Sequence, residues 1–125
     1  MADSIRVLTF NLLALEHASG RERHEVVRRL LPGLRPDVVA LQEVTRHAGA
    51  DQAAALLGPE FEIVDLPGRT PQGVGECLAS RLPLGAVSTL DRPLAAGEPD
   101  GPRAAAVAVE VRCPPPLGPI LAVHH

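Results

Sequence analysis

An apolar strand, an amphipathic helix and a second apolar strand follow one another between residues 5 and 41. Residues 5–10 (IRVLTF) are rich in β-branched and aromatic side chains, which favours a short buried strand. From Gly20 onwards apolar residues recur at every fourth position and arginines fill the other face, as in an amphipathic helix. Residues 38–41 (VVAL) predict the second strand. This βαβ order predicts two parallel strands whose carboxyl ends open on one edge of a sheet, where ligands bind in open α/β folds.

The remaining sequence predicts one more helix and a series of strands. Ser19 is expected to cap the first helix with Glu22 as its capping-box partner, and Pro32-Gly33 is expected to end it. A second helix is predicted over residues 50–57. Strands are predicted over residues 61–66, 75–80, 84–90, 103–111 and 120–123, with a surface loop over 91–102. The pattern as a whole predicts an α/β (α+β) sandwich that opens with a βαβ unit and continues with mainly antiparallel strands.

Composition limits the classes of protein to which the chain can belong. Its 125 residues, 46% of them hydrophobic, suit one folded domain. A net charge of -3 gives no basic field that would attract nucleic acid, although it leaves nucleic acid open as a partner. Neither an export signal nor an apolar run of about 18 residues, the length of a membrane span, is present, so we expect a cytoplasmic protein without a membrane span. The spacing of Cys77 and Cys113 favours buried, reduced thiols over a disulfide or zinc framework.

Two polar residues follow the two predicted parallel strands. Asn11 ends the first strand and Glu43 lies just past the second. The βαβ geometry should bring the amide and the carboxylate side by side on the open edge of the sheet. Such oxygen donors suit Mg²⁺, which needs only one or two carboxylates besides waters and substrate phosphate oxygens. Spacing alone leaves open a turn-forming Asn11 and a solvated Glu43.

Three segments around these residues resemble a known family. TFNLL at 9–13, DVVALQEV at 37–44 and CLASRLPL at 77–84 resemble the N-terminal half of the endonuclease/exonuclease/phosphatase superfamily, which includes pancreatic-type deoxyribonucleases and inositol polyphosphate 5-phosphatases. The resemblance implies that residues 1–125 form the N-terminal part of one such domain, the first half of a four-layer α/β/β/α sandwich. It also implies hydrolysis of a phosphodiester or phosphomonoester substrate that depends on Mg²⁺ or Mn²⁺.

The resemblance also implies roles for single residues. Glu43 would be a direct magnesium ligand, Asn11 would orient the metal and the substrate phosphate, and Gln42 would position the end of the strand. The closing ILAVHH resembles the family strand that ends in a histidine contacting the scissile phosphate. By that register His125 is the catalytic match and His124 faces the other way, although the assignment could shift by one residue. Glu76 is either a partner of a histidine or a surface acid.

Other groups that the resemblance implies have no counterpart in the sequence. The family's Asp-x-Asn element and terminal Asp-His pair are missing, since the last aspartate is Asp100 and Asn11 is the sole asparagine. We therefore interpret the chain as an incomplete phosphoesterase, or alternatively as a non-catalytic remnant or binding module that keeps half of the fold. A half-sandwich should also expose an apolar sheet face. The acidic balance favours small or lipid-like phosphate esters over long DNA.

Overall fold

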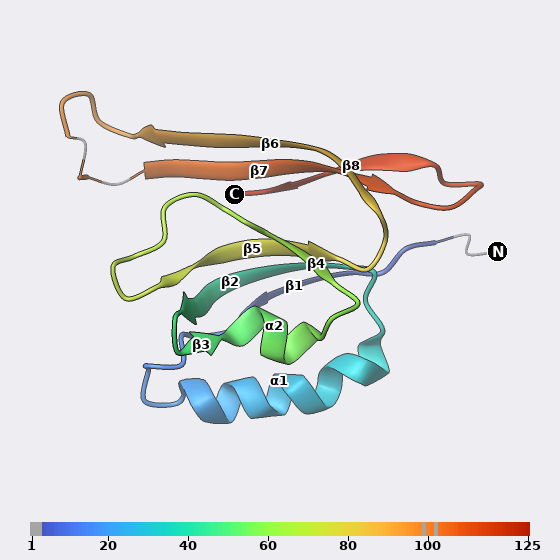
Figure 1. The fold of residues 1–125 in the computed structure, drawn as a ribbon, viewed down its shortest axis with the longest axis horizontal. Helices are drawn as coiled ribbons and strands as arrows, with labels where there is room; N and C mark the ends of the chain where they lie inside the picture. Colours follow the sequence, from blue (N-terminus) through green and yellow to red (C-terminus); the bar gives the residue numbers. More distant parts are fainter. Residues whose placement is uncertain (1–3, 99, 102) are drawn as a thin grey trace.

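The computed structural model describes residues 4–98, 100–101 and 103–125, which form three layers (Figure 1). Within these residues, helices α1 (Gly20–Leu34) and α2 (Gln52–Leu57) cover one face of a five-stranded sheet, and a three-stranded sheet lies on its other face. The strands are β1 (Val7–Asn11), β2 (Val38–His47), β3 (Ala50–Asp51), β4 (Glu62–Asp65), β5 (Val74–Ser80), β6 (Leu84–Pro93), β7 (Arg103–Arg112) and β8 (Pro119–His124). The predicted α/β sandwich is confirmed.

The sheet topology contains the predicted βαβ unit. The larger sheet has the order β1-β2-β5-β4, with the short β3 paired to the end of β2, and the smaller sheet has the order β6-β7-β8. Strands β1 and β2 are parallel, and Asn11 pairs in register with Gln42. All other pairings are antiparallel. The carboxyl end of β1 therefore meets the middle of β2 on one side of the molecule.

Strand β2 is longer than predicted because it contains a bulge. The pairing of β2 with β5 runs regularly to Leu41↔Cys77 and resumes at Val44↔Gly75, so β2 holds one more residue than β5 in this interval. Such an insertion shifts the alternation of side chains along a strand. Leu41 and Val44 consequently pack in the same core cluster although they lie three positions apart. Glu43, expected just past the strand, instead lies inside it, in the bulge.

The helix ends differ from the predictions. Ser19 is the N-cap residue of α1, but its side chain makes no capping hydrogen bond, because its φ of -109° and ψ of 9° are not the extended conformation of an N-cap. Pro32 lies within α1 instead of ending it. The helix runs to Leu34 and is closed by the Arg35 N–H, which donates to the Leu31 carbonyl at 3.1 Å. Helix α2 begins after Asp51, whose carboxylate accepts from the Ala54 N–H, so the predicted start at residue 50 was too early.

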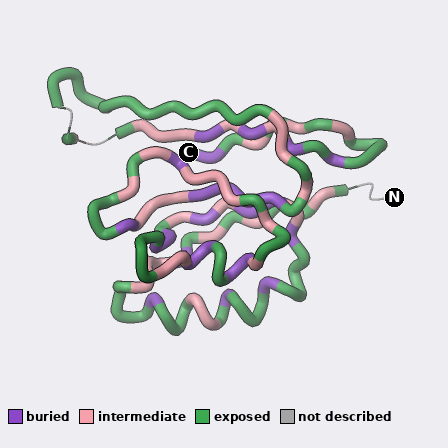
Figure 2. Tube along the Cα trace, in the orientation of Figure 1, coloured by how far each residue is buried: buried purple, intermediate pink, exposed green. Residues whose placement is uncertain are grey.

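The core has two parts, one on each face of the larger sheet (Figure 2). Apolar residues of α1 and α2 pack on β1, β2 and β5 in the first part, and β7 packs on β2, β4 and β5 in the second. Cys77 and Cys113 are both free and buried, as predicted. Burial raises the pKa of the Cys77 thiol to about 12, which keeps it protonated and unreactive at neutral pH.

The outer face of the smaller sheet is exposed and carries apolar side chains. Strand β6 runs to Pro93, so the predicted loop over 91–102 begins later than expected, and residues 99 and 102 lie outside the described residues. Leu90, Leu121 and Val123 are exposed. This agrees with the apolar sheet face that the sequence predicts. In the described part of the chain no helix has the length and apolar character that crossing a membrane requires.

An ion pair ties the start of β2 to the residue that follows β5. The Arg81 guanidinium donates to Asp37 at 2.6 and 2.8 Å, and the Arg6 backbone N–H donates to the same carboxylate at 2.7 Å. Burial alone would raise the pKa of Asp37, but these donors outweigh burial and hold the pKa below its usual value. A carboxylate with a lowered pKa stabilises the fold above its unfolded-state pKa, and this contribution is lost as the pH falls through the folded-state value.

We therefore expect Asp37→Asn to lower the free energy of unfolding by about 1.5–3 kcal/mol at pH 7, the usual worth of hydrogen bonds to a charged group. The difference from wild type should persist at pH 5 and shrink below about pH 4, where an unfolded aspartate is protonated. Urea denaturation of both proteins across this pH range measures it. A difference that is constant down to pH 2 would contradict the assigned role of the charge.

Candidate metal and phosphate site

Asn11 and Glu43 contact each other directly. The Asn11 Nδ2 donates to Glu43 Oε1 at 3.0 Å, and the Asn11 Oδ1 accepts from the Leu13 N–H at 3.0 Å. Parallel pairing of β1 with β2 supplies this proximity, and the bulge supplies the direction, since Glu43 adopts a φ of +52°. The amide thus orients the carboxylate, while Glu43 Oε2 has no protein partner among the described hydrogen bonds.

Gln42 lies beside this pair and links the two parallel strands. Its Nε2 donates to Thr9 Oγ1 at 3.1 Å, and its backbone oxygen accepts from the Leu12 N–H at 2.9 Å. Both bonds join β2 to the end of β1. Gln42 accordingly holds the strand ends together at the site, which is the positioning that the family resemblance implies.

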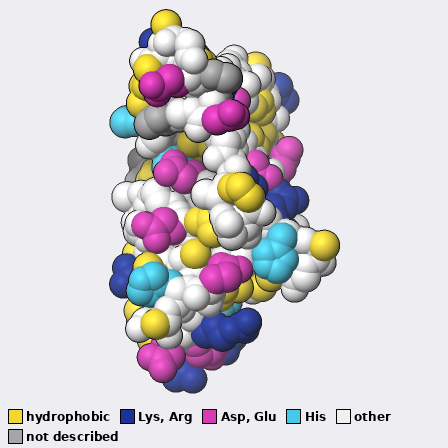
Figure 3. Space-filling model, turned by 90° about the vertical axis from the view of Figure 1, so that its left-hand side faces the viewer, with side chains coloured by type: hydrophobic (Ala, Val, Ile, Leu, Met, Phe, Trp, Pro, Cys, Tyr) yellow, Lys and Arg dark blue, Asp and Glu magenta, His cyan; other side chains and the backbone are white. Residues whose placement is uncertain are grey.

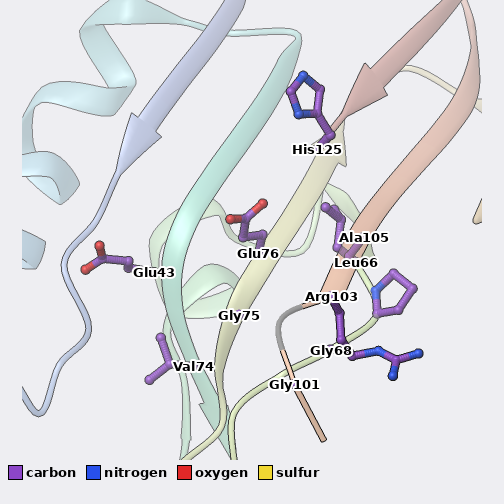
Figure 4. Close-up of a pocket in the computed structure, with 11 residues that line it drawn as sticks. Glu43, Leu66, Gly68, Val74, Gly75, Glu76, Gly101, Arg103, Ala105 and His125 are labelled. Atoms are coloured by element: carbon purple, nitrogen blue, oxygen red, sulfur yellow. The ribbon is translucent and has the colours of Figure 1, made fainter. Parts of the chain in front are cut away.

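A pocket of about 500 Å³ opens beside Glu43 (Figure 4). Its walls come from the bulge in the middle of β2, the loop before β5, the start of β5, the start of β7 and the residue after β8. The lining residues are Glu43, Leu66, Pro67, Gly68, Val74, Gly75, Glu76, Gly101, Arg103, Ala105 and His125. Glu43 and His125, which the sequence singles out separately, therefore border one cavity. Asn11 does not line this cavity itself, but it contacts Glu43, which does.

The two closing histidines have different surroundings. His124 is buried between the sheets, with its Nε2 3.5 Å from Glu76 Oε2 and 3.5 Å from the Leu41 carbonyl oxygen. His125 is exposed and lies on the pocket wall. The side chains alternate as a strand requires, but the inward-facing histidine, the one with a carboxylate partner, is His124. Of the two interpretations of Glu76, a partner of a histidine fits this geometry.

Charges of both signs surround the pocket. Arg103 lines it from β7 and donates to Asp91 at 2.6 Å. Figure 3 views the end of the molecule on which the carboxyl end of β2 lies, and there acidic side chains and histidines are interspersed with arginines. This face is not a uniformly basic surface of the kind that attracts a long polyanion.

The donor set fits a hydrated Mg²⁺ better than a metal with a complete protein cage. In the described residues no three histidine, cysteine or acidic side chains gather in a group that could hold a metal ion. Zinc sites usually need three or four such ligands, whereas Mg²⁺ keeps several waters and uses one or two carboxylates with substrate phosphates. The exposed carboxylate of Glu43, with one oxygen fixed by Asn11, meets the smaller requirement.

Sequence reasoning missed the loop between β4 and β5 as part of the site. Leu66, Pro67 and Gly68 line the pocket, although prolines and glycines in this segment indicate only a turn. The signal available in the sequence was the number of residues between the two strands, because β4 ends at Asp65 and β5 begins at Val74. A loop must therefore connect them at this end of the sheet. Nothing in the residue types shows on which face it lies.

Comparison with known proteins agrees with this architecture. The sequence model of the Endonuclease/Exonuclease/phosphatase family matches residues 8–122. A solved endonuclease/exonuclease/phosphatase family protein from Leptotrichia buccalis has a similar fold, with a TM-score of 0.72 and 15% sequence identity. The similarity covers 98% of this chain and 53% of that chain, so this chain spans about half the length of the solved relative. No curated protein matches the sequence. Because the family match extends over most of its residues, the chain belongs to the endonuclease/exonuclease/phosphatase family.

Proposed function

We propose that this chain forms the metal- and phosphate-binding half of a Mg²⁺-dependent phosphoesterase. The observation that carries the proposal is the 3.0 Å contact between Asn11 Nδ2 and Glu43 Oε1 at the edge of an open pocket. Glu43 would hold the cation, which Mn²⁺ can replace, and Asn11 would fix the carboxylate and face the substrate phosphate. When bound, the cation supplies Lewis-acid stabilisation of the charge on the phosphoryl oxygens.

The protein groups around the pocket suit a phosphate ester as ligand. Asn11 keeps Glu43 in one orientation, so the cation would meet an ordered carboxylate rather than a mobile one. His125 lies on the same pocket, and a histidine can donate a proton to an oxyanion near neutral pH. The mixed charges of the surrounding face favour a small or lipid-like ester over a long nucleic acid.

Mn²⁺ titration monitored by NMR tests the metal site. Asn11 is the sole asparagine, so a chain labelled with ¹⁵N-asparagine has one side-chain amide nitrogen signal, from the group that contacts Glu43. We expect paramagnetic Mn²⁺ to broaden this signal and excess Mg²⁺ to reverse the broadening. An Asn11 signal that stays sharp throughout the Mn²⁺ titration would refute the proposed metal site.

Replacing the two histidines separately tests the phosphate contact. We expect His125→Asn to weaken binding of inorganic phosphate in the presence of Mg²⁺ by about 10–150-fold, because a hydrogen bond to a charged group is worth roughly 1.5–3 kcal/mol. His124→Asn is the matched change, and it should lower stability with a smaller effect on phosphate affinity. Isothermal titration calorimetry measures both affinities. The reverse result would make His124, which has the Glu76 partner, the histidine that contacts phosphate.

An activity assay distinguishes the phosphoesterase from the alternative function, a binding module without hydrolysis. Hydrolysis of bis(p-nitrophenyl) phosphate that requires Mg²⁺ or Mn²⁺ would support the phosphoesterase. General acid–base groups contribute about 10²–10⁴ to such rates, and the sequence lacks the family's Asp-x-Asn and Asp-His elements. Metal and phosphate binding with no turnover would therefore favour the binding module.

A further inference from the structure

The structure assigns a positioning role to Arg69: we propose that its guanidinium holds the β2 bulge in the conformation that directs Glu43 at the pocket. The inference rests on the proposed function, because Glu43 is the proposed metal ligand. Arg69 belongs to the loop between β4 and β5, several residues away from any motif that the sequence contains.

The backbone at Glu43 needs support from its neighbours. Its φ of +52° lies in the left-handed region, which is unfavourable for any residue that has a Cβ. Such a conformation persists only where the surrounding structure fixes it. On the β1 side, the Leu12 N–H donates to the Gln42 carbonyl at 2.9 Å and Asn11 holds the carboxylate. The other side needs an equivalent restraint.

Arg69 supplies that restraint. Its Nη1 donates to the carbonyl oxygens of Val44 and Gly73, both at 2.8 Å, and its Nη2 donates to Asp65 Oδ1 at 2.7 Å. Val44 directly follows Glu43 and is completely buried, so bonding its carbonyl fixes the chain immediately after the bulge. One guanidinium thus connects the bulge of β2 to the loop that forms the opposite wall of the pocket.

The path of the Arg69 side chain is built into the sheet. The Arg69 side chain passes β5 at Gly75, where the Cβ of any other residue would lie 2.6 Å from Arg69 Cγ. Only one fifth of the Arg69 side chain is exposed, and Asp65 supplies its countercharge while also contacting Arg46. The planar fork of arginine makes these three bonds at once. A lysine ammonium could pair with Asp65 but is a point charge without that fork.

Arg81 provides a matched control. It pairs with Asp37 as Arg69 pairs with Asp65, but it follows the carboxyl end of β5, whereas Arg69 lies in the loop before the amino end of that strand. Replacing either arginine with glutamine removes one Arg–Asp ion pair from the larger sheet and its loops. Only the Arg69 change removes a bond to the bulge.

The test uses the metal-free chain labelled with ¹⁵N-asparagine, in which the Asn11 side-chain amide reports the position of Glu43. We expect Arg69→Gln and Arg69→Lys to shift this signal and Arg81→Gln to leave it in place. In the presence of Mn²⁺, we expect Arg69→Gln to weaken metal affinity by about 10–100-fold, the usual loss for a group that orients a ligand. Arg81→Gln should bind Mn²⁺ as wild type does, although it is less stable.

Three results would overturn the inference: an unmoved Asn11 signal in Arg69→Gln, wild-type behaviour of Arg69→Lys, or an equal shift in Arg81→Gln. The second would show that charge alone suffices, and the third that the shift reflects general loosening of the sheet. Failure of the wild-type chain to bind Mn²⁺ would refute the proposed function instead. The metal-free comparison would still decide the role of Arg69, because it needs no cation.

Discussion

Glu43→Gln should abolish metal binding while leaving the fold intact. Glutamine keeps an oxygen that can accept from Asn11 Nδ2, so the contact between β1 and β2 can persist. The substitution removes the carboxylate charge that Asn11 contacts, and neutral amides are poor substitutes for the carboxylates that Mg²⁺ prefers. We expect Mn²⁺ affinity to fall by more than about 100-fold, beyond the 10–100-fold loss usual for groups that only orient a ligand.

The measurement is the Mn²⁺ broadening of the Asn11 side-chain signal, together with metal-dependent hydrolysis wherever it is detected. Glu62→Gln is the matched control, because Glu62 is also an exposed strand glutamate but lies on β4, outside the pocket. Both variants change the net charge equally, so a loss confined to Glu43→Gln cannot come from the overall field. Retained Mn²⁺ affinity in Glu43→Gln would remove Glu43 from the metal site, and with it the proposed function.

Local sequence patterns predicted the elements that make the site, because their causes are local. The β-branched residues of 5–10 and the four-residue spacing of α1 depend on neighbours in the chain, and the parallel pairing of β1 with β2 follows from their order. That pairing brings Asn11 close to Glu43, while the direction of the Glu43 side chain comes from the bulge. The resemblance to the family is what distinguished Asn11 and Glu43, as candidate metal-site residues, from the other polar residues at strand ends.

The bulge was not predicted, although the sequence holds a trace of it. In the segment LQEV, the apolar residues Leu41 and Val44 are three positions apart. Residues on one face of a regular strand are two positions apart. An interruption of this kind indicates a bulge only when both residues are known to pack on the same face, and that depends on pairing with the distant β5. The same limit applies to His124 and His125, whose orientation is set by pairing with β7.

The β4–β5 loop depends on Gly73, whose replacement by alanine should be among the most destabilising single changes in the chain. Gly73 has a φ of +82°, and a Cβ there would lie 2.4 Å from the Arg46 carbonyl oxygen, a backbone atom that cannot move aside alone. The left-handed conformation costs about 1–2 kcal/mol for a residue with a Cβ. Forced overpacking adds about 1–3 kcal/mol. We therefore expect Gly73→Ala to lower the free energy of unfolding by about 2–5 kcal/mol, measured by urea denaturation.

Gly68→Ala separates the two contributions, because it lies in the same loop with a φ of +91° but has no atom within 4 Å of an added Cβ. That variant should lose only the conformational part, about 1–2 kcal/mol. Equal losses in both variants would show that the loop moves away from β2 without cost. A larger loss at Gly73 would instead show that the loop packs tightly against β2 at this residue. The Gly73 carbonyl oxygen accepts from both the Arg46 backbone N–H and the Arg69 guanidinium. A rigid loop at this point is what allows one arginine to connect the pocket wall to the bulge that carries Glu43.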